Sequence, residues 1–239
     1  MSVSYFVFFV TPSAAETRVA GAEIDALCDV LRTVRGLVEG LVFTPAPADT
    51  KHPFPDDGPP PPLALQLRFR TLPDLEATLR RDGDLQRVAE AGLLRSLAGA
   101  AVTQQAMMTR SFAVADPGAA APDRPRCSYL VHYPGAAEDL NAWLAHYVDH
   151  HPAIMARFPG VREIEIYTRV DWIDAMPWTR VAHMQRNKLV FDSPQALSAA
   201  LLSPVIREMR ADFHSFPRFT GGNLHYPMMT RVVSPAAPP

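Results

Sequence analysis

The sequence predicts an α+β fold made of two tandem ferredoxin-like β-α-β-β-α-β repeats that pack sheet to sheet within one chain. First, four short segments of the first half recur in the same order 121 to 124 residues later. Second, each half alternates extended and helical patterns in the order of that unit. Third, such a sheet carries helices on one face only, so its other face must be buried, and the sister repeat is the obvious partner. The recurring segments are "YFVFFV" from Tyr5 and "YLVHYP" from Tyr129, "GLVEGLVFT" from Gly36 and "GVREIEIYT" from Gly160, "FRTLPDLEATL" from Phe69 and "FDSPQALSAAL" from Phe191, and "MMTR" at 107–110 and 228–231.

Apolar and β-branched runs predict the strands, and the spacing of apolar residues predicts the helices. The first ten residues, "MSVSYFVFFV", are apolar but lack a basic leader and are too few to span a membrane, so we expect a buried strand. Gly36 and Gly160 end the first helix of each half, as helix-stop glycines do. In the second half we expect strands at 127–133, 161–170, 182–191 and 224–233, and helices at 137–158 and 194–212.

Shifts in composition divide the chain into three parts. Residues 1–114 form the first repeat, which we expect to be a scaffold, and residues 127–234 form the second repeat, which carries the proposed site. The Pro-, Gly- and Ala-rich segment 115–126 is the predicted linker. Four consecutive prolines exclude a helix or a central strand from the loop at 45–62. Its counterpart at 171–180 carries two tryptophans, and we expect such loops to border a site.

The composition is typical of a soluble globular protein, with 48% hydrophobic and 20% charged residues. A net charge of -2 without a basic cluster argues against nucleic-acid binding, so we expect a small-molecule substrate, with no nucleic acid and no membrane as partner. Cys28 and Cys127 are too few for a disulfide framework or a thiolate zinc site, and a reducing cytoplasm fits best. Whether the chain forms a homo-oligomer is left open.

Two motifs carry a resemblance to a known family. The segment "HPAIMARFPG" at 151–160 places a helix histidine at a fixed distance before Pro-Gly, and "FDSPQAL" from Phe191 follows the pattern F-x-S-x-x-x-L. With these motifs the second half resembles the EthD-like proteins of the dimeric α+β barrel superfamily, which includes muconolactone-type isomerases. The first half resembles them only in architecture. The resemblance implies a dimeric α+β barrel formed within one chain, a cofactor-free catabolic enzyme, and a place in the substrate cavity for His151.

The residues themselves also direct attention to His151. On the predicted helix 137–158 it shares one stripe with apolar side chains such as Tyr147 and Met155, so it is expected to face the core. His146 and His150 fall on the other side, where a solvated role is expected. A core histidine satisfied by a hydrogen bond is the alternative to a site role.

Comparison of the two halves shows polar residues at core positions of the second. Gln185 and Asn187 stand where the first half has Leu63 and Leu65, and burying an unpaired amide costs on the order of 1–3 kcal/mol. His183, His151 and His132 likewise replace Pro61, Leu27 and Phe8, and His225 and Tyr226 replace Gln104 and Gln105. We therefore expect a cavity between the helices and the sheet of the second half, lined by His151, His183, Gln185, Asn187 and Tyr147. A buried polar network without a cavity is the alternative.

In such a cavity a neutral imidazole can accept and return a proton near pH 7. We assign His151 as the general acid/base with His183 assisting, and expect the amides of Asn187 and Gln185 to polarise a carbonyl oxygen. Arg169 and Trp172 are placed at the mouth, Arg169 either as a carboxylate anchor or as a plain surface charge. The substrate-binding candidates are Tyr147, Asn187, Gln185, Trp172, Arg169, His132, His225 and Tyr226.

Neither a metal nor a nucleotide cofactor is expected. His150 and His151 are adjacent on a helix and point apart, and the chain has no Gly-rich phosphate loop and no G-x-S-x-G elbow. The predicted function is a cofactor-independent catabolic enzyme of the isomerase or lyase type, with ester or lactone hydrolysis left open, acting on a small aromatic-derived acid. The alternatives are a cofactor-free oxygenase and a non-catalytic barrel that binds a small molecule or haem.

Overall fold

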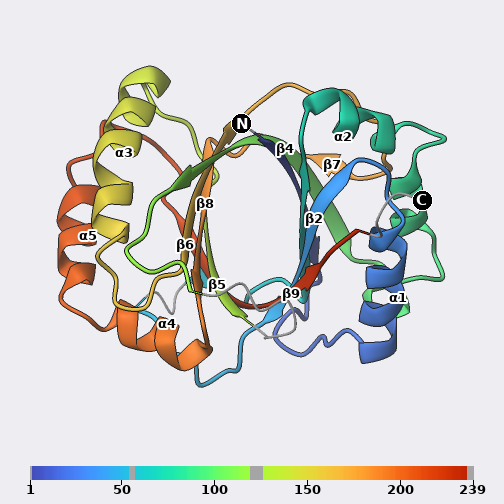
Figure 1. Cartoon of the computed structure of the whole chain (residues 1–239), viewed down its shortest axis with the longest axis horizontal. Coiled ribbons are helices and arrows are strands. Elements are labelled where there is room, and N and C mark those ends of the chain that lie inside the picture. Colours follow the sequence, from blue (N-terminus) through green and yellow to red (C-terminus); the bar gives the residue numbers. More distant parts are fainter. Residues whose placement is uncertain (1, 54–56, 119–125, 236–239) are drawn as a thin grey trace.

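A computed structural model of the chain describes residues 2–53, 57–118 and 126–235 and shows an α+β barrel (Figure 1). Eight antiparallel strands close into the barrel, and helices cover it from two opposite sides. Most of the predicted linker, residues 119–125, lies outside the described residues.

The first half of the chain forms four strands of the barrel and one helical layer. Its second helix begins where the Thr71 hydroxyl accepts a hydrogen bond from the amide of Asp74 at 3.2 Å. Two short 3-10 helices, at Asp84–Ala89 and Arg95–Leu97, then lead to the last strand. The elements are β1 (Ser2–Val10), α1 (Gly21–Arg32), β2 (Leu37–Pro45), β3 (Leu63–Phe69), α2 (Leu72–Leu79) and β4 (Ala101–Phe112).

The second half forms the other four strands and the opposite helical layer. The predicted helix 194–212 is two helices, because Pro204 has no amide hydrogen with which to continue the first one. The predicted helix 137–158 begins later, at Asp139, whose carboxylate accepts a hydrogen bond from the amide of Ala142 at 2.9 Å. The elements are β5 (Arg126–Tyr133), α3 (Leu140–Met155), β6 (Glu163–Arg169), β7 (Thr179–Arg180), β8 (Gln185–Phe191), α4 (Pro194–Leu201), α5 (Val205–Phe213) and β9 (Leu224–Val233).

The barrel closes because the two four-stranded sheets join at both edges. The strand order is β1-β3-β2-β9-β5-β8-β6-β4, and β4 pairs back with β1. The joins between the halves are β2 with β9, where Gly40 faces Val233, and β4 with β6, where Met107 faces Arg169. Closure leaves these eight strands without free edges, which removes the usual risk of edge-to-edge association.

Side chains alternate along each strand between the barrel interior and a helical layer. The leucines of β3 pack beneath α1 and α2 in one apolar core, and the aromatic residues of β5 pack beneath α3, α4 and α5 in a second. The barrel interior holds a third apolar cluster, with Phe6, Phe43 and Met228 among its members. It also holds buried charged side chains, among them Glu165, Arg186 and Lys188.

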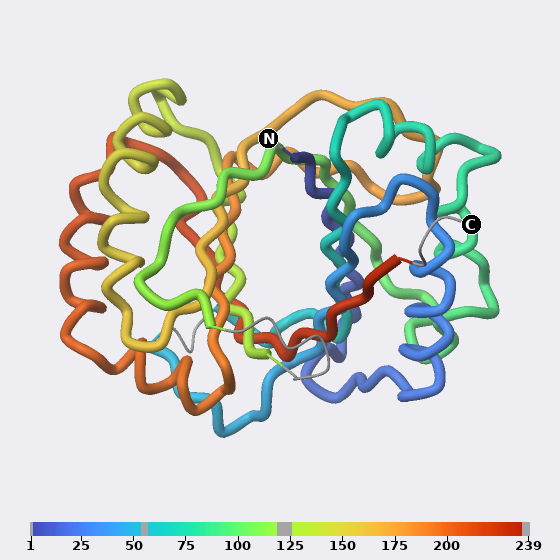
Figure 2. Tube along the Cα trace, in the orientation of Figure 1, coloured from blue at the N-terminus to red at the C-terminus, as the bar shows by residue number. Residues whose placement is uncertain are grey.

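The loops between the middle strands of each half cross to the other half (Figure 2). From the first half, the amide of Lys51 donates to Ser198 Oγ on α4 at 2.9 Å. From the second half, the amide of Ala175 donates to the carbonyl of Leu79 at 2.9 Å, and β7 pairs in parallel with β4. Each half therefore has a loop that packs against a helix of the other half.

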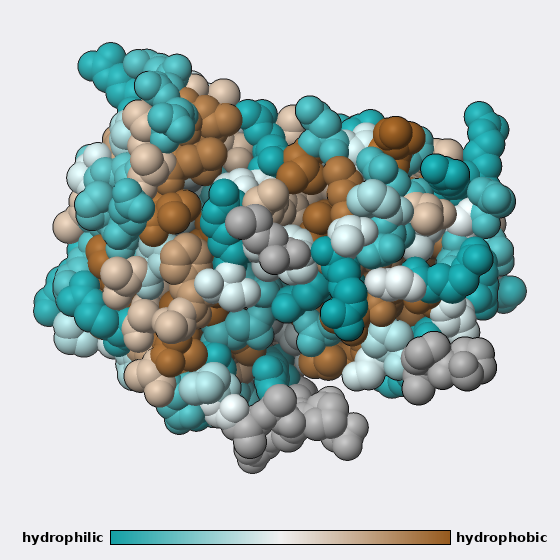
Figure 3. Space-filling model, turned by 45° about the horizontal axis from the view of Figure 1, so that its top comes forward, coloured by the Kyte–Doolittle hydropathy of each residue, from teal (hydrophilic) through white to brown (hydrophobic). Residues whose placement is uncertain are grey.

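Among the described residues, no helix is long and apolar enough to cross a membrane. The face drawn in Figure 3 mixes hydrophilic and hydrophobic residues. In the described part of the chain, the large apolar side chains with most exposure are Ile173, in the loop at 171–180, and Leu202, at the end of α4.

Candidate active site

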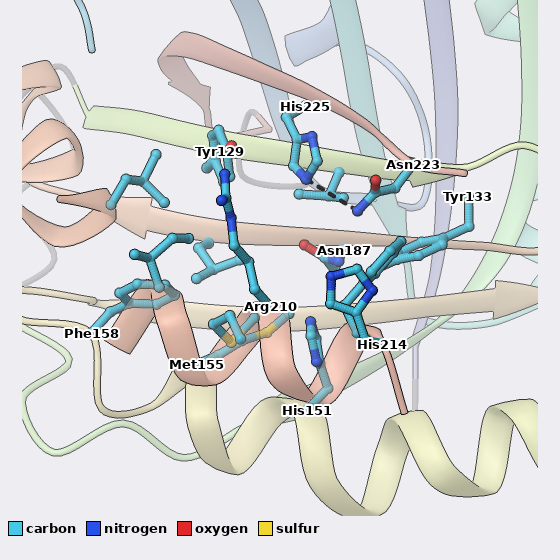
Figure 4. Close-up of a pocket in the computed structure, with 16 residues that line it drawn as sticks. Tyr129, Tyr133, His151, Met155, Phe158, Asn187, Arg210, His214, Asn223 and His225 are labelled. Carbon is cyan, nitrogen blue, oxygen red and sulfur yellow. Dashed lines mark hydrogen bonds between the residues drawn. The ribbon is translucent and has the colours of Figure 1, made fainter. Parts of the chain in front are cut away.

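A cavity of about 250 Å³ lies between the sheet of the second half and its helices (Figure 4). Strands β5, β8 and β9 form its floor, and α3, α4 and α5 form its roof. Its walls are mostly apolar, with a few polar groups that converge on one space, the arrangement usual for small-molecule sites. The lining residues are Tyr129, Val131, Tyr133, His151, Met155, Phe158, Asn187, Leu189, Leu201, Ile206, Met209, Arg210, Phe213, His214, Asn223 and His225.

His151 lines this cavity from α3 and is paired with a carboxylate from α5. Its Nδ1 lies 2.6 Å from Oδ2 of Asp212, and only 5% of the His151 side chain is exposed. Burial lowers the pKa of His151, and the Asp212 carboxylate partly opposes that shift. The ring is therefore neutral at pH 7. A neutral imidazole donates through Nδ1 to the carboxylate, which leaves the Nε2 lone pair to accept a proton.

A second histidine–carboxylate pair lies at the sheet side of the same cavity. Nδ1 of His225 is 2.6 Å from Oδ2 of Asp57, and the same oxygen accepts the backbone amide of His225 at 2.8 Å. Asp57 belongs to the crossing loop of the first half, so that loop completes the second-half site. Asn223 Nδ2 lies 3.2 Å from His225 Nε2, as the dashed line in Figure 4 shows.

Asn187 supplies an unpaired polar atom to the centre of the cavity floor (Figure 4). Its Nδ2 donates to the hydroxyl of Tyr147 at 2.7 Å, and its Oδ1 has no hydrogen-bond partner among the described residues. The buried hydroxyl of Tyr129 is also without a partner in the described part of the chain. Buried polar groups are normally satisfied, so these two atoms are suited to a hydroxyl or carbonyl group of a bound molecule.

The structure gathers some of the predicted site residues and separates others. His151, Asn187 and His225 line the cavity, and Tyr147 lies directly behind Asn187. Gln185 is fully buried on the same face of β8 but does not reach the cavity.

The expected position of His183 beside His151 is wrong. His183 precedes β8 rather than lying in it, so the strand alternation used to place it does not apply, and it lines a different pocket at the end of the barrel. His132 and Tyr226 line that same pocket, because their side chains point to the barrel interior while those of Val131 and His225 point to the helices.

The expected position of Arg169 and Trp172 at the cavity mouth is also wrong. Arg169 ends β6 on the surface. Trp172 packs into the apolar core of the first half, with the Arg180 guanidinium 3.7 Å from the centre of its ring. The cause is the path of the loop at 171–180, which leaves its own half.

Sequence reasoning missed both carboxylates that hold the histidines. Asp212 lies 61 residues from His151, and Asp57 lies 168 residues from His225, so no local spacing connects either pair. His214, Arg210 and Asn223 were missed for the same reason, since each enters the cavity through the packing of α5 or the turn before β9. Among the described residues, no group of three or more His, Cys, Asp or Glu side chains could hold a metal ion.

Replacing Asn187 by leucine, the first-half residue, is expected to leave stability unchanged or raise it. The change removes a buried carbonyl that has no partner among the described residues, worth on the order of 1 kcal/mol, which corresponds to about 2–4 °C in Tm for a chain of this size. Ligand binding in the cavity should weaken at least tenfold. Thermal melts and titrations measure both. The matched control is Leu65→Asn, which places an amide in the packed first-half core and should lower Tm clearly. A drop in Tm for Asn187→Leu would instead mark Asn187 as a structural amide.

Comparison with solved structures shows the same fold at low sequence identity. An anthrone oxidase-like protein superposes with a TM-score of 0.61 at 13% identity, covering 98% of this chain and 92% of its own. A "putative monooxygenase" from Fusobacterium nucleatum gives 0.56 at 9% identity, covering 98% and 94%. Another from Lactobacillus acidophilus gives 0.54 at 8% identity, covering 98% and 97%. No family model matches the sequence, and no curated protein matches it significantly, so membership of the EthD-like family stays a prediction. The likenesses show that this chain has the fold of an α+β barrel.

Proposed function

We propose that this protein is a small-molecule catabolic enzyme in which His151 removes a proton from a substrate bound between the sheet and the helices of the second half. The observation that carries the proposal is the His151–Asp212 pair at the wall of a mostly apolar cavity. A positioned base with a carboxylate behind it is the usual arrangement for general base catalysis.

The surrounding residues support this chemistry step by step. Asp212 holds the Nδ1 hydrogen and stabilises the imidazolium that forms when Nε2 takes the proton. The apolar walls exclude water and strengthen the electrostatic interactions within the cavity. We expect Asn187 Oδ1 and the Tyr129 hydroxyl, from residues that line the cavity, to orient a polar group of the substrate.

The fate of the substrate anion decides the reaction class. Return of the proton to a different atom gives an isomerase, and expulsion of a leaving group gives a lyase. Reaction of a stabilised carbanion with dioxygen gives a cofactor-independent oxygenase. The names of the three structural neighbours, one "anthrone oxidase-like" and two "putative monooxygenase", favour the oxygenase. We therefore place oxygenation first and isomerisation second, with no cofactor required in either.

Isotope exchange tests the shared first step. Wild-type protein in D2O without dioxygen should exchange the acidic C–H of its substrate, and anthrone and muconolactone are the two probes. Admitting dioxygen should start oxygen uptake with anthrone if the enzyme is an oxygenase. Absence of exchange with both probes and with other carbon acids of similar size would contradict the proposal. A Soret band stoichiometric with the purified protein would indicate the haem-binding alternative instead.

The exchange rate should fall on the acidic side with a midpoint below pH 6.5. Burial lowers the pKa of His151 from its ordinary 6.5, so the neutral base persists into mildly acidic solution and is lost only as pH falls through the lowered value. Rates measured between pH 4.5 and 8 give the midpoint. A midpoint above 7 would show that another group is the base.

We also propose that the two halves are tandem copies of one ferredoxin-like unit. Four recurring segments and the matching order of strands and helices in each half support this. The cytoplasmic location and any association of two chains remain predictions.

A further inference from the structure

A second pocket, of about 210 Å³, lies at one end of the barrel. It shares strands β5, β8 and β9 with the candidate active site but lies on their other face, because side chains alternate along a strand. The proposed catalytic step uses none of its residues. They are Phe8, Val10, Ala14, Pro59, Pro61, Thr103, His132, Val181, His183, Arg186, Leu224 and Tyr226.

The pocket contains a buried cation, the guanidinium of Arg186. Arg186 is 2% exposed, and its guanidinium carbon lies 4.7 Å from the centre of the Phe8 ring. Nη1 contacts His132 Nδ1 at 2.6 Å and Nε donates to Gln105 Oε1 at 3.3 Å, both neutral partners. Among the described residues no carboxylate forms an ion pair with it. Burial lowers the pKa of Arg186 to about 9, so the guanidinium is still charged at pH 7.

The next inward-facing residue of the same strand shows what is missing. Lys188 is equally buried, but its Nζ lies 2.8 Å from Glu163 Oε1 and 2.9 Å from Glu165 Oε2. Buried charges in proteins are normally paired in this way. Among the described residues Arg186 departs from that rule, and its side chain lines this pocket.

His132 offers the pocket a second hydrogen-bond donor. A guanidinium can only donate, so His132 Nδ1 must accept from Arg186 and the ring proton must lie on Nε2. That Nε2 is buried and has no partner among the described residues. Nδ1 of His183, whose ring centre is 6.0 Å from that of His132, is likewise unpartnered in the described part of the chain.

We propose that this pocket is a binding site for a small organic carboxylate with an apolar body, separate from the candidate active site. The carboxylate accepts hydrogen bonds from Arg186 and from Nε2–H of His132, since a planar guanidinium matches a carboxylate. Pro61, Val181 and Leu224 contact the apolar body. The proposal does not depend on the chemistry of His151.

Calorimetric titration at pH 7 in low-chloride buffer tests this proposal, with benzoate as the anionic probe and benzamide as its neutral counterpart. Wild-type protein should bind benzoate at least tenfold more tightly than benzamide. Arg186→Met should weaken benzoate binding at least tenfold. Arg186→Lys keeps the positive charge but loses the planar pair of N–H donors, so it should weaken benzoate binding less. The matched control is Arg210→Met, which removes a guanidinium from the other cavity and should change benzoate affinity less than twofold.

Three results would overturn the proposal. They are equal affinity for benzoate and benzamide, unchanged benzoate affinity in Arg186→Met, and loss of benzoate binding in Arg210→Met. Arg186→Met should melt no lower than the wild type without ligand, because it loses a buried charge that no carboxylate of the described residues pairs with. Should that variant fail to fold, the comparison of the two probes on wild type and on Arg186→Lys decides the question. Turnover is not measured, so failure here leaves the proposed function untouched.

Discussion

Replacing His151 by alanine should lower substrate turnover about 10²- to 10⁴-fold, the usual contribution of a general acid or base. The same variant should melt within a few degrees of the wild type, because the ring borders an existing cavity and its removal enlarges that space rather than creating a new void in a packed core. Exchange or oxygen-uptake rates and thermal melts on the same preparation provide the comparison.

The adjacent His150 is the matched control for this prediction. It is exposed on the outer face of α3, where its Nδ1 contacts the carbonyl of His146 at 2.8 Å. His150→Ala should retain wild-type turnover. Equal losses of fold and activity in His151→Ala would identify a packing histidine and end the catalytic assignment.

Asp212 is predicted to be a positioning residue that acts through His151. The carboxylate raises the pKa of the His151 ring against the larger lowering effect of burial. Asp212→Asn should therefore shift the acidic limb of the rate profile to lower pH and reduce the plateau rate. When His151 is already alanine, adding Asp212→Asn should not lower the rate further. Such non-additive effects are expected of two residues that act together. An unchanged pH profile in Asp212→Asn would show that the pair has no catalytic role.

The second large effect is expected in the barrel interior, where Glu165→Gln should destabilise the protein by about 3–5 kcal/mol. Glu165 is 1% exposed and lies 2.9 Å from Lys188 Nζ and 2.6 Å from Arg68 Nη2. Removing its charge leaves Lys188 with Glu163, and leaves Arg68 with Glu39 and Glu163; both of these carboxylates are about one-third exposed. For a chain of this size the loss corresponds to a drop of about 6–20 °C in Tm.

The control for this effect is an ion pair of the same chemistry on the surface. Arg157 and Glu208 lie 2.7 Å apart with about half of each side chain exposed. Glu208→Gln should cost no more than about 1 kcal/mol. Similar small changes in both variants would show that the interior network is solvated.

The interior network should also control acid stability. Burial alone would raise the pKa of Glu165, but Lys188 and Arg68 outweigh it and lower the pKa to about 2, below the ordinary 4.5. The stabilisation is therefore complete above about pH 4.5 and is lost as pH falls towards 2. Unfolding free energies measured across this range should fall less steeply in Glu165→Gln than in the wild type.

The order of the elements could be predicted from the sequence because it rests on local patterns. The alternation of Leu63, Leu65 and Leu67 fixes which face of their strand meets the helices, and the stripe through Tyr147, His151 and Met155 fixes the inward face of theirs. The replacement of Leu65 by Asn187 correctly directed attention to the helical side of the second half. The same logic failed for His183, which lies before its strand and outside its alternation.

Tertiary structure alone decided which carboxylate meets which histidine. His151 and Asp212 come together because α3 packs against α5, and His225 meets Asp57 because a loop of the first half crosses to the second. The opposite crossing carries Trp172 away from the site it was expected to border. Periodicity reports which face of a strand or helix is buried, but the path of a loop depends on the free energy of packing the whole chain, which no local spacing encodes.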